Sequence, residues 1–173
     1  MQTSVIGIWS RPRQRGFTLL EVMVVLLLIG IITGFAVLSV RGASPKEKLE
    51  TEARKLAALI ELNHQEAILF GEQRGVLFTE TGYGFMIRSG DDEWRYRQDT
   101  GVQTKVELPA EFSVNLWVEG QPISLVEPPL QPQVLLLSSG EATEFNATLG
   151  AEYVRGYSLS GDILGNLQLS AVE

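Results

Sequence analysis

The stretch RPRQRGFTLLE at residues 11–21 runs directly into VMVVLLLIGIITGFAVLSV at residues 22–40. The second stretch is nineteen residues long and carries no charged side chain. With a rise of about 1.5 Å per residue, a helix of this length nearly spans the roughly 30 Å hydrocarbon layer of a bilayer. The pattern therefore predicts a membrane-crossing helix that follows a basic leader.

Glu21 is an acid at the entrance of this apolar helix. A carboxylate inside a membrane helix costs a few kcal/mol, while each Leu, Ile, Val or Phe returns only about 0.3–0.6 kcal/mol. If the chain is cut between Gly16 and Phe17, a new α-amine begins the helix, and Glu21 lies four residues further along on the same helix face. We therefore expect Glu21 to have a pairing role, and a neighbouring subunit could offer its own amine to this carboxylate.

The hexapeptide GFTLLE at residues 16–21, followed by the apolar run, resembles the class III signal of type IV pilins and type II secretion pseudopilins. The resemblance implies that a prepilin peptidase cleaves after Gly16 and that the new N-terminal Phe17 is N-methylated. It also implies that Glu21, the fifth residue of the mature chain, guides the subunit into a helical filament.

Two simpler interpretations compete with this one. A conventional secretory signal has a small-residue cleavage site after its apolar core, but here a cut after Ala43 would place Arg41 at the −3 position. A plain membrane anchor with an incidental Glu21 is the other alternative. The Gly16-Phe17 junction and the position of Glu21 favour the pilin-like signal over both.

Charge and composition restrict what the rest of the chain can do. The chain has 173 residues, a formal net charge of −7 and no cysteine, and removal of the leader's three arginines would take the charge to −10. This acidity argues against a nucleic-acid partner, because phosphate contacts need clustered Lys and Arg. A basic leader stays in the cytoplasm, so the C-terminal domain is expected on the outer side of the membrane, which is the periplasm if the cell is Gram-negative.

A second, amphipathic helix is predicted after the apolar one. Ser44-Pro45-Lys46-Glu47 has the pattern of a capping box with proline at the first helical position, and Gly71 is a stop signal. One helix face collects the apolar residues and is interrupted at Asn63. The members of this face are Leu49, Ala53, Leu56, Ile60, Ala67 and Phe70.

Short apolar runs between turn signals replace the helical period beyond Gly71. The expected strands are Gly75–Thr79, Tyr83–Arg88, Trp94–Gln98, Val102–Leu108, Phe112–Val118, Ile123–Val126, Val134–Leu137, Ala142–Asn146, Tyr153–Leu159 and Asn166–Ser170. Such close spacing predicts antiparallel hairpins. We therefore expect an α+β fold, in which a long N-terminal helix, with a membrane half and an amphipathic half, packs on an antiparallel β domain of one or two sheets.

The expected organisation has four segments. Residues 1–16 are a cytoplasmic leader that the prepilin peptidase removes, and residues 17–41 are the transmembrane and filament-core helix. Residues 44–70 form the amphipathic helix, and residues 72–173 form the periplasmic β domain.

Later motifs narrow the resemblance to the H-type minor pseudopilins of type II secretion. They are EAI at residues 66–68, GVLF at 75–78, GYGF at 82–85, VLLLSSGE at 134–141, and Gly156-Tyr157 with Gly165-Asn166-Leu167. The resemblance implies a subunit at or near the tip of a periplasmic pseudopilus that helps export folded proteins across the outer membrane. Its implied partners are the other minor pseudopilins, the major pseudopilin, the prepilin peptidase and the inner membrane. A minor pilin of a type IV pilus and, less favoured, a tethered periplasmic binding protein or enzyme are the alternatives.

Catalytic and ligand-binding patterns are weak. His64 is the only histidine, and no G-x-S-x-G nucleophile motif accompanies it, so we interpret it as a solvated or packing residue. Asp91, Asp92, Glu93 and Asp99 form a weak calcium pattern that a turn explains more simply. The alternation around Trp94 and Tyr96 suggests a strand rather than a ligand-stacking site. We therefore predict no enzymatic activity, cofactor or metal.

Overall fold

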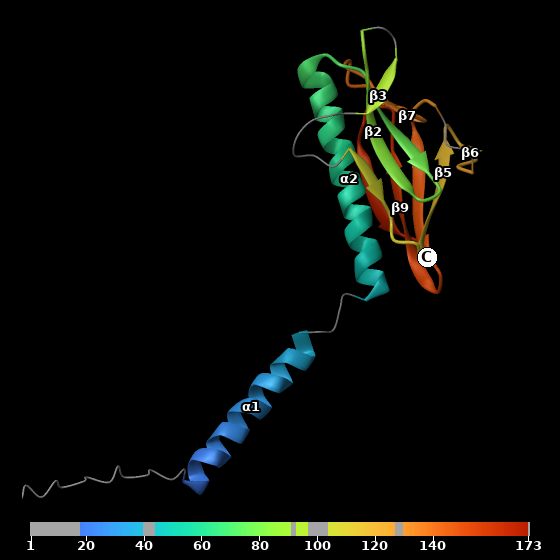
Figure 1. The fold of residues 1–173 in the computed structure, drawn as a ribbon. Coiled ribbons are helices and arrows are strands. Elements are labelled where there is room, and N and C mark those ends of the chain that lie inside the picture. The colour runs from blue at the N-terminus through green and yellow to red at the C-terminus, as the bar shows by residue number, and fades with distance from the viewer. Residues whose placement is uncertain (1–17, 40–43, 91–92, 97–103, 127–129, 173) are drawn as a thin grey trace, which may run out of the picture. The chain divides into compact units, whose positions relative to one another are not determined.

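The computed structural model describes residues 18–39, 44–90, 93–96, 104–126 and 130–172. Its contacts divide the chain into two compact units, Met1–Gly42 and Ala43–Glu173. The first unit contains the helix α1 (Leu19–Ser39), and the second contains the helix α2 (Pro45–Phe70) and all the strands (Figure 1). The predicted leader of residues 1–16 lies outside the described residues.

The predicted limits of α2 are confirmed in detail. Ser44 Oγ accepts a hydrogen bond from the Glu47 N–H at 3.3 Å, and Glu47 Oε2 accepts one from the Ser44 N–H at 2.8 Å. This reciprocal pair is the capping box, and Pro45 lies between its two members at a position that needs no intrahelical N–H bond. The helix stops at Gly71, which is left-handed and donates its N–H to Ala67 O.

The buried face of α2 differs from the prediction at two positions. Leu49, Ala53, Leu56, Ile60 and Ala67 are all buried as expected. Phe70 was predicted on this face but is 59% exposed at the last residue of the helix, where Ile68 and Leu69 are exposed as well. Asn63 was predicted to interrupt the face, yet it is only 1% exposed and continues the buried stripe. A polar side chain at such a position needs a buried partner.

The described strands form two five-stranded antiparallel sheets. In the first sheet the order is β3-β2-β1-β7, with β4 also paired to β2, and in the second it is β10-β9-β8-β5-β6. The bounds are β1 (Arg74–Thr79), β2 (Gly82–Arg88), β3 (Trp94–Tyr96), β4 (Lys105–Glu107), β5 (Phe112–Val118), β6 (Gln121–Ile123), β7 (Val134–Leu136), β8 (Phe145–Ala151), β9 (Val154–Gly161) and β10 (Leu167–Ala171). The α+β class and the antiparallel pairing are thus confirmed, and the number of sheets is two.

Two strands lie at shifted positions. The strand predicted at Ala142–Asn146 is β8, which begins at Phe145 and pairs continuously with β5, whereas Ala142 forms only an isolated bridge to Leu136. The strand predicted at Ile123–Val126 is β6, which begins at Gln121. The β5–β6 turn has only two residues, Glu119 and Gly120, both with positive φ, so pairing resumes earlier than expected.

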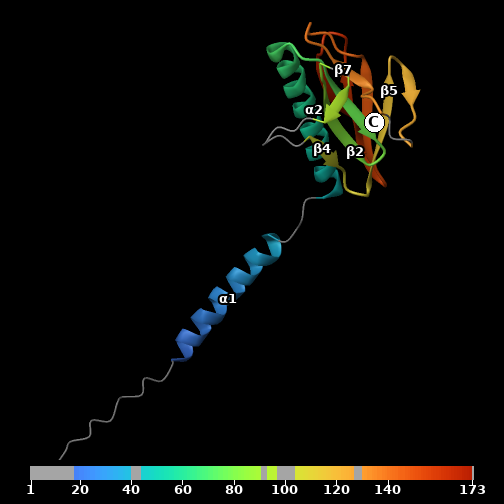
Figure 2. The same cartoon turned by 45° about the horizontal axis from the view of Figure 1, so that its top comes forward.

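The hydrophobic core lies between α2 and the two sheets. The helix contacts β8, β9 and β10 of one sheet and β1 and β7 of the other, and both views show it running alongside the β domain (Figure 2). Phe78 on β1 and Phe145 on β8 join the sheets, with ring centroids 6.4 Å apart. Because the core includes residues of α2 from Leu49 to Ala67, the helix is an integral part of this unit.

Deleting residues 1–41 should therefore leave a folded, soluble protein. The capping box at Ser44 lets α2 begin without the preceding helix, and the core residues all come from the second unit. We expect β-rich circular dichroism and a single cooperative melting transition. An unfolded product would show that the second unit needs the first one to fold, which would contradict this division of the chain.

Candidate assembly site

The N-terminal turn of α1 carries the described part of the predicted processing and assembly signal. Thr18 Oγ1 accepts a hydrogen bond from the Glu21 N–H at 3.2 Å, and Thr18 O accepts one from the Val22 N–H at 3.3 Å. Thr18 therefore caps the helix, a role that we did not predict from the sequence. Glu21 lies in the first turn, where the helix dipole favours a negative charge. Gly16 and Phe17 lie outside the described residues.

The first unit offers an apolar helix with no buried face. Every side chain described in α1, over residues 19–34, is exposed, and Leu19 and Ile32 are 82% and 67% exposed. Exposed apolar surface on this scale marks an interaction site for other helices or for lipid. Among the described residues, no helix combines the length and the hydropathy of a membrane span.

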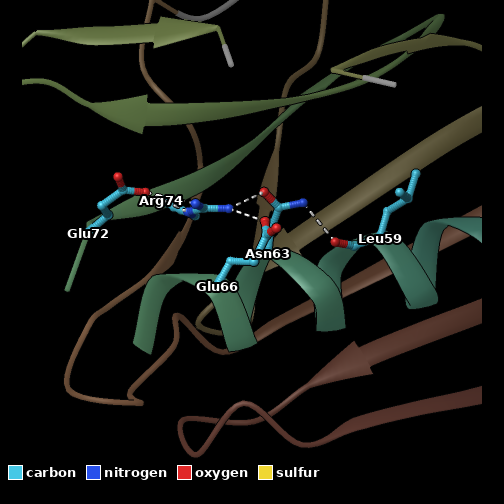
Figure 3. A network of polar contacts seen from close by, with 5 residues as sticks. All are labelled: Leu59, Asn63, Glu66, Glu72 and Arg74. Carbon is cyan, nitrogen blue, oxygen red and sulfur yellow. Dashed lines mark hydrogen bonds and ion pairs between the residues drawn. The ribbon is translucent and has the colours of Figure 1, made fainter. Parts of the chain in front are cut away.

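A buried polar network fixes the C-terminal end of α2 to the first strand (Figure 3). Its centre is Arg74, the first residue of β1, whose side chain is only 3% exposed. The guanidinium donates to Glu66 on α2, to Glu72 Oε2 at 2.7 Å and to Asn63 Oδ1 at 3.5 Å. Asn63 Nδ2 in turn donates to Leu59 O at 2.8 Å. The network thus supplies the partner that the buried Asn63 needs.

A second, more exposed link connects the N-terminal half of α2 to β9. Tyr157 Oη donates to Glu50 Oε2 at 3.0 Å, and Arg54 Nη2 donates to Glu50 Oε1 at 2.8 Å. The hydrogen bonds from Arg54 and Tyr157 lower the pKa of Glu50, and the bond to Glu50 raises the pKa of Tyr157. The two links hold both halves of α2 on the β domain.

His64 has a packing role, as the sequence suggested. Its Nε2 lies 2.9 Å from Gly140 O, and its ring lies against Gly165. A Cβ atom at residue 165 would come within 2.0 Å of the imidazole, and the φ of +77° also favours glycine in this turn between β9 and β10. The histidine therefore joins α2 to two turns of the β domain.

Only Glu93 of the weak calcium pattern lies among the described residues. Asp91, Asp92 and Asp99 lie outside them, and no group of three or more acidic or histidine side chains that could hold a metal ion occurs in the part of the chain that the structure describes. Trp94 and Tyr96 belong to β3, as expected for a strand, and the Tyr96 ring lies against Gly84 of β2.

The sequence contains a local signal for the Arg74 network. Asn63 lies at i+3 from Ile60 and at i−4 from Ala67, so helical spacing places it on the buried stripe. A polar residue there implies a nearby buried partner, and Arg74 follows the helix after a short turn. What the sequence could not show is that Glu66 and Glu72 would both reach the same guanidinium.

Comparison with known proteins agrees with the N-terminal signal. The family model of the prokaryotic N-terminal methylation motif matches residues 11–37, a range that contains Gly16, Phe17 and Glu21. The type II secretion system protein H of Pseudomonas aeruginosa is 34% identical over 155 residues, which cover 84% of this chain and 88% of the relative. The protein of the same name from Escherichia coli K12 is 35% identical and covers 78% and 79% of the two chains.

This chain belongs to the type II secretion system protein H family. The relatives' names decide between the two filament systems that the N-terminal signal left open, in favour of type II secretion. The solved structures agree on the fold. The crystal structure of the minor pseudopilin EpsH from Vibrio cholerae matches with a TM-score of 0.66 and 23% identity, over 75% of this chain and 98% of that one. The solution structure of E. coli GspH matches with a TM-score of 0.58 and 18% identity, over 76% and 95%.

Proposed function

We propose that this protein is a processed, membrane-anchored assembly subunit of the pseudopilus. A prepilin peptidase removes residues 1–16, Phe17 is methylated, and residues 17–41 hold the subunit in the inner membrane with the β domain in the periplasm. The subunit then joins other minor pseudopilins and the major pseudopilin at or near the tip of a short filament. We propose no catalytic role.

One observation carries this proposal. The methylation motif covers residues 11–37, which include most of the apolar helix α1. The described side chains of this helix are all exposed, and Glu21 lies in its first turn. An exposed apolar helix is stable only when lipid or other helices cover it. Lipid would cover it before assembly, and neighbouring subunits afterwards.

The second unit would give the subunit its specificity. The hydrophobic core of this unit is formed by residues of α2 and of the strands, so the outer surfaces of the unit are available to contact other minor subunits. A filament tip built from such subunits would help to move folded proteins through the outer-membrane channel.

Glu21→Ala tests this mechanism, because insertion and assembly should respond in opposite directions. Loss of the acid should leave membrane insertion of the isolated subunit unchanged or improved. In the filament, a partner's N-terminal amine would lose its counter-charge, and breaking a buried pair costs about 3–5 kcal/mol. We expect the yield of cross-links to neighbouring pseudopilins to fall about tenfold or more, since 1.4 kcal/mol is about tenfold.

The measurement uses single cysteines introduced into a chain that has none of its own. Disulfide yield reports assembly, and resistance to alkaline extraction reports insertion. Glu61→Ala, which removes an exposed acid from α2, is the matched control and should change neither. Secretion alone does not decide the matter, because a minor subunit is present in few copies. Normal cross-linking of the Glu21→Ala protein would mean that the carboxylate pairs with nothing and that α1 is only an anchor.

A further inference from the structure

The strand β10 forms an open edge of the second sheet. The order β10-β9-β8-β5-β6 gives β10 a single neighbour, β9, in the described part of the chain. The two strands pair without a register shift from Leu167↔Gly161 to Ala171↔Tyr157. The opposite side of β10 therefore carries the backbone groups that β9 does not use.

The register identifies those groups. The Asp162 N–H donates to Asn166 O at 3.1 Å, and the Val172 N–H donates to Gly156 O at 2.9 Å, so residues 166 and 172 both bond toward β9. Residues of an antiparallel strand alternate between bonding to the partner and pointing away from it. Leu167, Leu169 and Ala171 therefore direct their N–H and C=O groups outward. Alternate residues of a strand are about 6.6–6.8 Å apart, so these groups form a regular row.

The other three sheet edges carry features that discourage pairing. The edge strand β6 contains Pro122, which has no N–H to donate. Among the described residues, the edge strands β3 and β7 span three residues each, and β3 carries the exposed Arg95. The three-residue β4, which also pairs with β2, exposes the charged Lys105 and Glu107. Proteins protect open edges by such means, namely proline, charge and short length.

None of these protections is present along β10. Residues 167–172 read LQLSAV, without charge, proline or glycine, in a chain whose net charge is −7. Gln168, Ser170, Ala171 and Val172 are exposed, and Leu167 and Leu169 are half-buried against the core. An edge of this length and composition matches the surfaces to which proteins add a strand from a partner.

We propose that the β10 edge binds an extended, uncharged strand of a different pilin-like subunit, which continues the second sheet across the interface. This inference rests on the proposed function, because it assumes a filament in which this chain has unlike neighbours. Outward N–H and C=O groups at every second residue match the spacing of another extended backbone, which can replace the water that hydrates them in the free subunit. A second copy of the chain is disfavoured as the occupant because two strongly acidic chains repel each other.

Hydrogen exchange at single-amide resolution tests the inference. The full mature chain is purified in detergent, alone and together with the other pseudopilins of the same cell. Alone, the amides of Leu167, Leu169 and Ala171 should exchange fast and those of Gln168 and Ser170 slowly. In the complex, the three outward amides should slow by at least about tenfold.

A pair of variants separates edge pairing from folding. Ala171→Pro removes an outward N–H at an exposed position and leaves the bonds to β9 in place, whereas Ala171→Val keeps the N–H. Cross-links from a cysteine at residue 168 to the partner should be lost with Ala171→Pro and retained with Ala171→Val, while both proteins melt at similar temperatures.

The outcomes distinguish the inference from the function on which it rests. A complex that forms while the three outward amides still exchange fast would overturn the β10 inference and leave the proposed function standing. Failure of the wild-type chain to form any complex with the other pseudopilins would overturn both. Protection that rises with concentration in the purified chain alone would identify a second copy as the occupant and overturn the choice of an unlike subunit.

Discussion

Arg74→Ala should destabilise the β domain by about 3–5 kcal/mol, the cost expected when one partner of a buried ion pair is removed. The substitution leaves the carboxylate of Glu66, which is 17% exposed, without the guanidinium between α2 and β1. It also takes away the donor that reaches Asn63 Oδ1 inside the core. Unfolding in urea should show a lower midpoint with an unchanged slope.

Arg54→Ala is the matched control for this experiment. Arg54 also pairs with a glutamate, Glu50, but its side chain is 70% exposed, and surface ion pairs contribute only about 0–1 kcal/mol. Arg74→Met adds a second comparison, because an apolar side chain of similar length replaces part of the lost packing but none of the hydrogen bonds. If Arg74→Ala cost no more than Arg54→Ala, the network of Figure 3 would not be what holds the end of α2.

Gly16→Leu should abolish processing of the leader. The prepilin peptidase must bring an extended junction close to its catalytic site, and a branched side chain at residue 16 obstructs that approach. We expect the membrane fraction to contain only the precursor with residues 1–16, and the precursor to be absent from the assembled filament. Mass spectrometry distinguishes the two forms directly.

Gly7→Leu provides the control, because it makes the same change within the leader but away from the junction. This variant should be processed like the wild type. Normal processing of Gly16→Leu would mean that the glycine is not read by the peptidase, and the proposed cleavage position would be wrong.

Local signals in the sequence predicted much of this fold. The limits of α2 followed from the Ser44 to Glu47 capping box and from Gly71, because both depend on residues within one helical turn of the helix ends. The ten strands followed from apolar runs between turns, although β6 and β8 lay a few residues from their expected positions. Those shifts came from pairing with β5, a contact between distant parts of the chain that local patterns do not report.

The functional features were also predictable only where they depend on a continuous stretch of sequence. The N-terminal signal at Gly16, Phe17 and Glu21 is a continuous pattern, and the motif match over residues 11–37 agrees with it. The Arg74 network and the outward groups of β10 depend on which strand meets which, so they required the structure. The exposure of Phe70 could not be predicted either, because helical spacing does not show which turns of a helix the rest of the fold covers.

The mass of the wild-type protein in cells that contain the prepilin peptidase tests the central claim most directly. Our account predicts a chain that begins at Phe17, lacks residues 1–16 and carries one additional methyl group on its N-terminus. A wild-type protein that retains residues 1–16 in such cells would contradict the account and would leave the helix after Glu21 without a role in filament assembly.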